Sequence, residues 1–166
     1  MTKTKTILFI CTGNTCRSYM AETIGKHYLS GKEGGQGIRL VSAGTGSLAN
    51  EPASVQARAV MGEMGFDPMD HRAKNLTAEM VREAQLVLTM TASQKRQVLA
   101  LVPEADDKVF LLKEYSEEHK RLQEMEKELN NLDVIDPFGL PLEYYRTCAL
   151  ELQNLVTRAV ERFTTD

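Results

Sequence analysis

The sequence predicts an α/β fold, a single-domain, doubly wound sheet of about four parallel strands with helices on both faces. Short apolar runs without polar alternation recur along the chain, which is typical of strands buried on both faces of a parallel sheet. Helical stretches separate these runs, and such alternation indicates a parallel sheet. The chain has 166 residues, enough for one substantial core, and its sequence contains neither an internal repeat nor a linker.

Four strands are predicted from runs rich in Ile, Leu, Val and Phe. They cover residues 6–10, 38–43, 86–90 and 109–112. The stretch 30–37 contains four glycines and is predicted as a loop, because it cannot hold a helix.

The predicted helices lie between the strands. They run from about residue 18 to 29, from 53 to 64, from 77, from 91 or 93 to 102, and from 141 to 163. Gly65 is a typical C-cap, and Thr77 is a typical N-cap. Either Thr91 or Ser93 caps the next helix. The last helix carries an apolar stripe, so Cys148 is expected in the core.

The loop between the first strand and the first helix has the composition of an anion site. Gly13 and Asn14 tolerate backbone conformations that other residues resist, so successive N–H groups can turn inward. The start of the helix adds unpaired N–H groups and the positive end of a dipole. Because ligands of open α/β sheets bind at the carboxyl ends of strands, we expect a phosphate-binding loop here.

Two side chains of this loop supply reactivity. Arg17 has a planar fork that matches two oxygens of a tetrahedral oxyanion. Cys11 is expected to react as a thiolate, and Ser18 can donate a hydrogen bond to its sulfur. A thiolate beneath a phosphate cradle is a nucleophile aimed at phosphorus. The alternatives are a buried structural cysteine and an arginine that closes the loop through a salt bridge.

The pattern Cys-x5-Arg-Ser from Cys11 to Ser18 resembles the low-molecular-weight protein tyrosine phosphatase family. Together with the stretch Asp136–Gly139, it is most similar to the branch of bacterial protein arginine phosphatases. The resemblance extends over nearly the whole chain, from residue 7 to about 163. We therefore expect a single phosphatase domain over residues 1–166, with a phosphocysteine intermediate.

The resemblance implies roles for individual residues. Cys11 is the expected nucleophile, Arg17 holds the phosphoryl oxygens, and Asp136 is the general acid. The residues expected to contact the substrate are Thr12, Gly13, Asn14, Thr15, Cys16, Ser18 and Phe138, and Ser42 is expected to support the loop. No cofactor is implied, and the sequence has no metal-ligand spacing.

Several of these residues have an alternative reading. Asp136 precedes a proline, and Asp-Pro is a common turn pair. Phe138 could stack on a planar guanidine or phenol, or pack in the core. Thr15 could bond a nearby amide; the matching residue of the arginine branch is a threonine, which leaves room for a guanidine. Cys16 could be a passive small residue, or a redox partner that forms a reversible disulfide with Cys11.

Two features depart from the family pattern. Tyr19 stands where proline is usual, and because proline suits a first helical turn, a looser helix start is expected. The charged segment 116–132 is longer than in the family, and its helical spacing predicts a solvated surface helix, with partner docking as the alternative. His27 and His71 are expected at the surface or at helix ends.

Composition narrows the cellular setting. The net charge of −3 and the isoelectric point of about 5.7 argue against nucleic acid as a partner. No apolar run approaches the roughly 20 residues that span a bilayer, and no signal peptide is found. Three cysteines, two of them in one loop, suit a reducing cytosol. We expect a cytoplasmic monomer whose partners are phosphorylated proteins and inorganic phosphate or another oxyanion.

The sequence therefore predicts a protein phosphatase that acts on phosphoarginine. A tyrosine phosphatase with the same machinery is the first alternative. A thiol-dependent arsenate reductase is the second, although it needs further cysteines. The third is a phosphoprotein-binding module or a phosphocysteine carrier, which needs neither Arg17 nor the Asp-Pro acid.

Overall fold

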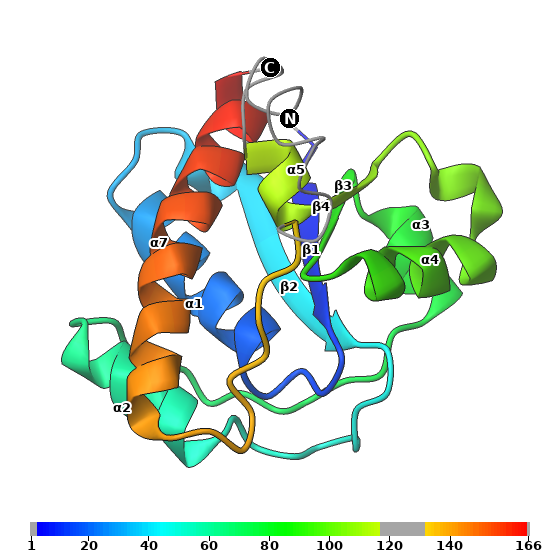
Figure 1. The fold of residues 1–166 in the computed structure, drawn as a ribbon. Helices are drawn as coiled ribbons and strands as arrows, with labels where there is room; N and C mark the ends of the chain where they lie inside the picture. Colours follow the sequence, from blue (N-terminus) through cyan, green and yellow to red (C-terminus); the bar gives the residue numbers. More distant parts are fainter. Residues whose placement is uncertain (1–2, 117–131, 166) are drawn as a thin grey trace.

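A computed structural model of the protein describes residues 3–116 and 132–165. Its centre is an all-parallel sheet with the strand order β2-β1-β3-β4 (Figure 1). The strands are β1 (Lys5–Cys11), β2 (Ile38–Gly44), β3 (Leu86–Thr89) and β4 (Val109–Leu111). The predicted parallel sheet of four strands is thus confirmed.

β1 lies inside the sheet and is apolar on both faces. Its residues Ile7 and Phe9 belong to one hydrophobic cluster, and Leu8 and Ile10 belong to the other. All four side chains are fully buried. This explains the uninterrupted apolar run in the sequence, because a strand that is covered on both faces has no polar side.

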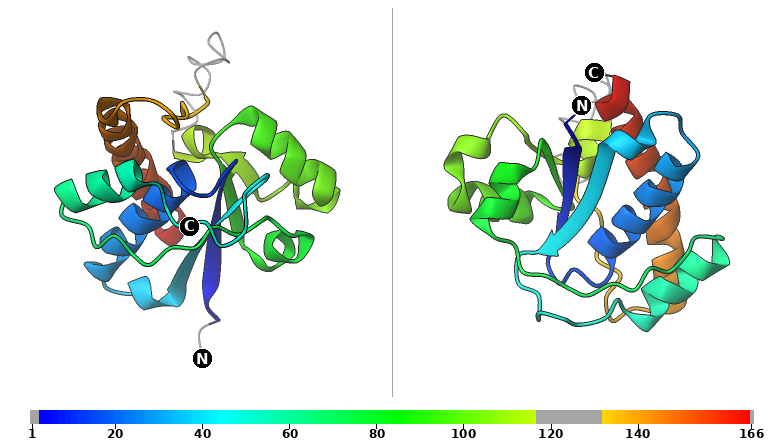
Figure 2. Two further views of the ribbon diagram at one scale, coloured as in Figure 1. Left: turned by 90° about the horizontal axis from the view of Figure 1, so that it is seen from below. Right: turned by 180° about the vertical axis from the view of Figure 1, so that it is seen from behind.

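Helices cover both faces of the sheet, as predicted (Figures 1 and 2). One face is covered by α1 (Arg17–Ser30), α2 (Val55–Glu63), α5 (Leu112–Ser116) and α7 (Leu142–Thr165), and the other by α3 (Ala78–Glu83) and α4 (Ala92–Leu101). Two short 3-10 turns precede β2 and β4, namely η1 (Gly35–Gly37) and η2 (Pro103–Ala105).

Capping residues end or begin several helices at the positions that the sequence predicted. The Thr77 hydroxyl caps α3. Thr91, and not Ser93, caps α4, and it forms a reciprocal pair in which the Gln94 side chain accepts from the Thr91 backbone N–H. Gly65 follows the C-cap of α2 with a φ of 82°, a conformation that favours glycine.

Three short elements escaped the prediction, and one of them is η2 between α4 and β4. The helix α5 begins directly after β4, and η1 lies within the glycine-rich stretch that was predicted as a loop. The helix predicted over 116–132 lies almost entirely outside the described residues.

The position of β1 creates the crevice in which a site can form. From β1 the chain passes to β2 on one side of it, whereas β3 lies on its other side. At such a switch point the connections leave the carboxyl ends of the strands in opposite directions, so a ligand can enter between them. The β1–α1 loop, residues 12–16, lies at this point (Figure 1).

Candidate active site

The first half of the β1–α1 loop is fixed by the segment that follows β2. The Thr45 backbone N–H donates to the Cys11 carbonyl oxygen, and the Gly46 backbone N–H donates to the Thr12 carbonyl oxygen. Both distances are 3.0 Å. A Cβ atom on Gly44 would lie 2.4 Å from the carbonyl oxygen of Thr12. The two backbones can approach this closely only because residue 44 is glycine.

Asn14 connects the loop to three other parts of the chain by hydrogen bonds. It is fully buried and has a φ of 57°, in the left-handed region. Its Nδ2 donates to the Ser18 hydroxyl at 2.8 Å and to the Ser42 hydroxyl at 2.9 Å, and its Oδ1 accepts from the Lys74 backbone N–H at 2.9 Å. His71 Nε2 lies 2.6 Å from the Asn14 carbonyl oxygen. These contacts hold a conformation that asparagine tolerates better than most residues do.

Gly13, in contrast, does not use the freedom that we expected of it. Only Gly34, Gly65 and Gly139 have positive φ among the described glycines. A Cβ atom on Gly13 would meet only the Thr15 hydroxyl, at an ordinary distance of 3.5 Å. The expectation for Gly13 was therefore wrong, because Asn14 alone makes the left-handed turn.

The sulfur of Cys11 lies beneath this loop and receives hydrogen bonds there. It is 2.9 Å from the Ser18 hydroxyl oxygen, and the Asn14 backbone N–H donates to it at 3.2 Å. Because the Ser18 oxygen already accepts from the Asn14 amide, its own proton is free to point at sulfur. Two hydrogen bonds therefore reach the sulfur and fix its position beneath the loop.

Arg17 connects the loop to the chain that precedes α7. Its side chain is buried, and its Nη1 donates to the Val134 carbonyl oxygen at 2.9 Å. Its Nη2 lies 3.3 Å from Oδ2 of Asp136, whose side chain is half exposed. Asp136 Oδ1 in turn accepts from the Phe138 backbone N–H at 3.1 Å. The structure thus places Asp136 beside Arg17, next to the loop that covers Cys11.

A buried carboxylate extends the loop's hydrogen-bond network toward the surface. Ser42, which accepts from Asn14, donates to Glu22 Oε1 at 2.6 Å. Glu22 is only 6% exposed, and its other oxygen bonds Lys26 Nζ at 2.7 Å. An ionised carboxylate only accepts hydrogen bonds, so Glu22 fixes the direction in which the Ser42 proton points.

Cys16 is buried and contacts two hydroxyl groups outside the loop, one of them on α7. Its sulfur is 3.5 Å from the Ser54 hydroxyl and 3.7 Å from the Tyr145 hydroxyl. Burial, followed by the contact with Cys16, raises the pKa of Tyr145 to about 12. The Ser54 backbone N–H donates to the Thr15 carbonyl oxygen at 3.0 Å, so the start of α2 fixes the rim of the loop.

His71 corrects one expectation, because it is buried rather than at the surface. It is only 7% exposed, and its ring lies 5.0 Å from that of Tyr19. Since the Asn14 carbonyl oxygen can only accept, the proton of the neutral ring sits on Nε2. Burial lowers the pKa of His71. His27, by contrast, lies in the last turn of α1, as expected.

Tyr19 lies in the core, and α1 begins before it, at Arg17. The helix begins at Arg17, and the Met20 backbone N–H donates to the Cys16 carbonyl oxygen at 2.8 Å. The Tyr19 side chain is fully buried, and burial raises its pKa. The missing proline is therefore replaced by a large side chain that packs beneath the loop.

The remaining predicted residues divide between the loop and its rim. The Thr12 hydroxyl accepts from Gln94 Nε2 at 3.1 Å. Thr15 is partly exposed at the rim, and Phe138 is 71% exposed. The alternative prediction that Phe138 packs in the core is thus wrong. Its exposed ring can contact a substrate. Cys148 is buried on α7 as expected.

Sequence reasoning missed four residues that shape the site, namely Glu22, Ser54, His71 and Tyr145. Only Ser54 could have been found from its neighbours in the sequence, because a serine before a helical run is a typical N-cap. In the structure its hydroxyl accepts from the Ala57 backbone N–H. The other three act through contacts with residues distant in the sequence.

Residues 3–116 and 132–165 hold neither a cluster of metal ligands nor a helix that could span a membrane. No three His, Cys, Asp or Glu side chains are grouped so that they could hold a metal ion. None of the helices described there combines the length and the apolar character needed to cross a bilayer.

Comparisons with known proteins give this geometry a context. Residues 6–166 match the family model described as "Low molecular weight phosphotyrosine protein phosphatase". A protein-arginine-phosphatase of Geobacillus stearothermophilus is 37% identical over 96% of this chain and 97% of its own length. A probable low molecular weight protein-tyrosine-phosphatase, EpsP, of Ralstonia solanacearum is 35% identical over 95% of each chain.

A solved structure also resembles the fold along the whole chain. It is a mutant of the arginine phosphatase YwlE with a phosphorylated active-site serine. It superimposes with a TM-score of 0.81 and 32% identity, and the match covers 97% of each chain.

Proposed function

The chain belongs to the low molecular weight phosphotyrosine protein phosphatase family, and from this premise we propose that it hydrolyses phosphoarginine in proteins through a phosphocysteine on Cys11. The observation that carries the proposal is the convergence of a hydrogen-bonded sulfur, a buried guanidinium and a half-exposed carboxyl group at one loop. These are the three groups that phosphoryl transfer through cysteine requires.

The first step is attack of the Cys11 sulfur on phosphorus. A phosphoryl group in the loop would lie against the backbone N–H groups and the positive end of α1. Arg17 supports this binding mode, because its Nε is buried and has no hydrogen-bond partner among the described residues. A phosphoryl oxygen would supply the missing acceptor. As negative charge spreads over the equatorial oxygens in the transition state, these donors bind more strongly.

Asp136 acts on the leaving group and then on water. As the phosphorus–nitrogen bond breaks, the Asp136 carboxyl group donates its proton to the guanidine nitrogen. Its carboxylate then removes a proton from water, which attacks the phosphocysteine and releases phosphate and the Cys11 thiolate. The half-exposed position of Asp136, in contact with Arg17 at the mouth of the loop, suits both roles.

The choice of phosphoarginine rests on the arginine phosphatase relative and on the rim of the loop. Thr15 is small there and carries a hydroxyl, which leaves room for a branched guanidine and can bond it. The exposed ring of Phe138 can stack on the planar guanidine, and Asp136 can hold its N–H groups. Phosphotyrosine is the second candidate, because EpsP is almost as similar to this chain.

The test is phosphate release from matched phosphoarginine and phosphotyrosine peptides, with Cys11→Ser as the blank. A preference of about a hundredfold for phosphoarginine, or ~2.7 kcal/mol of transition-state stabilisation, is expected. A preference for phosphotyrosine would show that Thr15 is incidental to specificity. Turnover retained by Cys11→Ser would overturn the covalent mechanism.

Two other activities fit the site less well. An arsenate reductase needs further reactive thiols, but burial raises the pKa of Cys148 to about 12, so this thiol stays protonated near neutral pH. A phosphocysteine carrier has no use for Asp136. A phosphocysteine that water does not clear would favour the carrier.

The remaining expectations concern the role of Cys16 and the oligomeric state, location and cofactor of the enzyme. All three cysteines are free thiols in the structure. Under peroxide we propose a disulfide between Cys11 and Cys16 that protects the nucleophile from irreversible oxidation; passive packing of Cys16 against Tyr145 is the alternative. We further propose that the enzyme works as a monomer in the cytoplasm, without a cofactor.

A further inference from the structure

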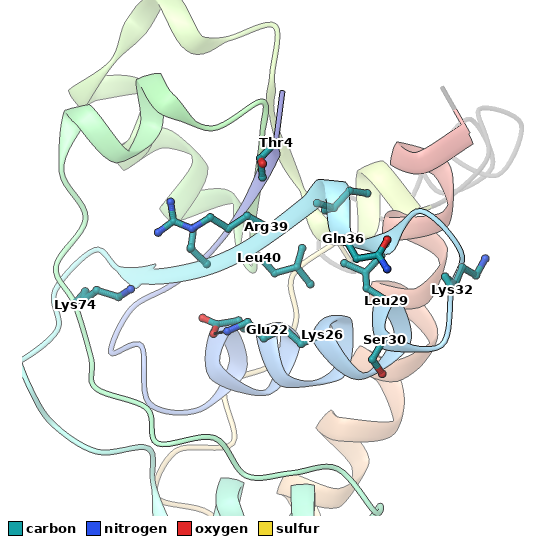
Figure 3. A pocket seen from close by; sticks show the side chains of 13 residues that line it. Thr4, Glu22, Lys26, Leu29, Ser30, Lys32, Gln36, Arg39, Leu40 and Lys74 are labelled. Carbon is teal, nitrogen blue, oxygen red and sulfur yellow. Dashed lines mark hydrogen bonds and ion pairs between the residues drawn. The ribbon is translucent and has the colours of Figure 1, made fainter. Parts of the chain in front are cut away.

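A groove that no residue of the β1–α1 loop lines runs between β2 and α1 (Figure 3). Its volume is about 710 Å³. Four consecutive residues of β2, from Ile38 to Val41, line it, and Arg39 and Leu40 lie on opposite sides of the strand in Figure 3. Because successive side chains of a strand point to opposite faces, a groove lined by consecutive residues follows the edge of the strand.

This edge is the outer edge of the sheet, and the chain itself already uses one end of it. Among the strands that the structure describes, β2 pairs with β1 alone. At its carboxyl end, the Gly44 N–H donates to the Lys74 carbonyl oxygen, and the Gly44 carbonyl oxygen accepts from the Leu76 N–H, both at 2.8 Å. An extended segment therefore lies beside the strand here, and the groove begins where this segment leaves the edge.

The lining of the groove has more cationic than acidic side chains. Lys26, Lys32, Arg39 and Lys74 line it, whereas its one acidic lining residue, Glu22, is buried. Lys26 is paired with Glu22, and Lys32 is paired with Glu161. Arg39 and Lys74 are exposed, and neither has an ion pair within residues 3–116 and 132–165.

Apolar side chains form the floor between these cations. Leu29 of α1 and Leu40 of β2 are buried there, and Ile38 is partly exposed. A groove along a strand edge, with an apolar floor and cations on its walls, suits an extended chain in which acidic and apolar residues alternate.

We propose that this groove docks an extended acidic segment of a partner protein along the edge of β2. A second copy of this chain is the poorer occupant, because a two-fold contact would place the same cations against one another. The proposal does not depend on which phosphorylated residue the active site hydrolyses.

The test measures binding of a short fluorescein-labelled peptide of alternating Glu and Val by fluorescence anisotropy, with the full chain at physiological salt. We expect saturable binding that Arg39→Glu/Lys74→Glu weakens by at least about tenfold, since both cations face the ligand. The matched control is Arg58→Glu/Arg96→Glu, which changes the net charge equally at exposed positions outside the groove. It should leave binding unchanged, because charges farther than about 8 Å are screened at this salt concentration.

Several outcomes would overturn the proposal. They are absence of saturable binding, equal weakening by the control variant, and equally tight binding of a peptide of alternating Lys and Val. Sedimentation of the unliganded protein tests whether a second copy of the chain occupies the groove. Self-association that Arg39→Glu/Lys74→Glu abolishes would assign the groove to that second copy and overturn the proposal. Hydrolysis of phosphopeptides by both double variants should persist, because Lys74 holds Asn14 through its backbone N–H and the substitution changes only its side chain. This separates the binding test from that of the proposed activity.

Discussion

Asn14 shows how much of the site depends on a single side chain. Its left-handed backbone turns the loop, its amide nitrogen positions two serine hydroxyls, and its backbone N–H donates to the Cys11 sulfur. Glycine would allow the same turn but would leave Ser18 and Ser42 without their donor. Asparagine is suited to this position because it tolerates the conformation and supplies the hydrogen bonds.

Asp136 is expected to govern the chemical step and not the binding of the oxyanion. In Asp136→Asn, kcat for the phosphopeptide should fall by about a hundredfold or more, which is the usual contribution of a general acid. Inhibition by inorganic phosphate should be at least as strong as in the wild type, because the asparagine amide has the size of the carboxyl group and cannot carry a negative charge that repels the anion. Steady-state kinetics measure both quantities.

The control for Asp136→Asn is Asp133→Asn in the same connection. The Asp133 carboxylate accepts from the Ala92 backbone N–H, away from Arg17. Its loss should leave kcat within a few-fold of the wild type. If Asp136→Asn behaved in the same way, Asp136 would have no place in the mechanism.

Thr15 is expected to set the preference between a guanidine and a phenol. Thr15→Ile adds bulk and removes the hydroxyl at the rim, so the ratio of kcat/KM for phosphoarginine over phosphotyrosine should fall by at least about tenfold. Thr15→Ser keeps a small hydroxyl and should preserve the ratio. An unchanged ratio in Thr15→Ile would remove this residue from substrate recognition.

At the scale of elements, the ends of helices and strands hold the loop from outside. The start of α2 binds the Thr15 carbonyl oxygen, and the segment after β2 binds the carbonyl oxygens of Cys11 and Thr12. Arg17 is itself the first residue of α1 and bonds the chain before α7 through Val134. The loop is therefore rigid because elements from several parts of the sequence anchor it.

Ser54→Ala should weaken the start of α2. The Ser54 hydroxyl accepts from the Ala57 backbone N–H at 3.1 Å, and the loss of such a cap costs about 1 kcal/mol of unfolding free energy. Urea denaturation followed by circular dichroism measures the change. Ser93→Ala is the control, because Ser93 lies inside α4 and does not cap it. Equal stability of the two variants would contradict the capping role of Ser54.

For the whole molecule, buried His71 links stability to pH. Burial lowers the pKa of His71 in the folded state below the ordinary value of 6.5, so the unfolded chain binds the proton more readily. The contribution of neutral His71 to stability is therefore complete above about pH 6.5 and declines as the pH falls toward the pKa of the folded state, by at most about 1.4 kcal/mol per pH unit.

His71→Gln should remove this dependence. The free energy of unfolding of the wild type should fall more between pH 7 and pH 5 than that of His71→Gln, as measured by urea titrations at each pH. His27→Gln, at the exposed end of α1, should follow the wild type. Parallel curves for the wild type and His71→Gln would show that protonation of His71 does not oppose folding.

The sequence by itself determined the strands, most helix ends and the composition of the loop. These features depend on neighbours in the chain: a continuous apolar run needs cover on both faces, and the caps Thr77 and Thr91 bond their own helices. The spacing of Cys11 and Arg17 is of the same local kind, and the distant Asp136 was found only through its family resemblance.

Tertiary structure alone decided how the loop is held. His71 and Tyr145 reach it from distant parts of the chain, Glu22 acts on it through Ser42 of β2, and the groove along β2 exists only because this strand lies at the edge of the sheet. No local pattern encodes these contacts, because a histidine or a glutamate has the same sequence signature whether it faces solvent or a buried carbonyl group. Burial and partners are fixed only when the helices pack on the sheet.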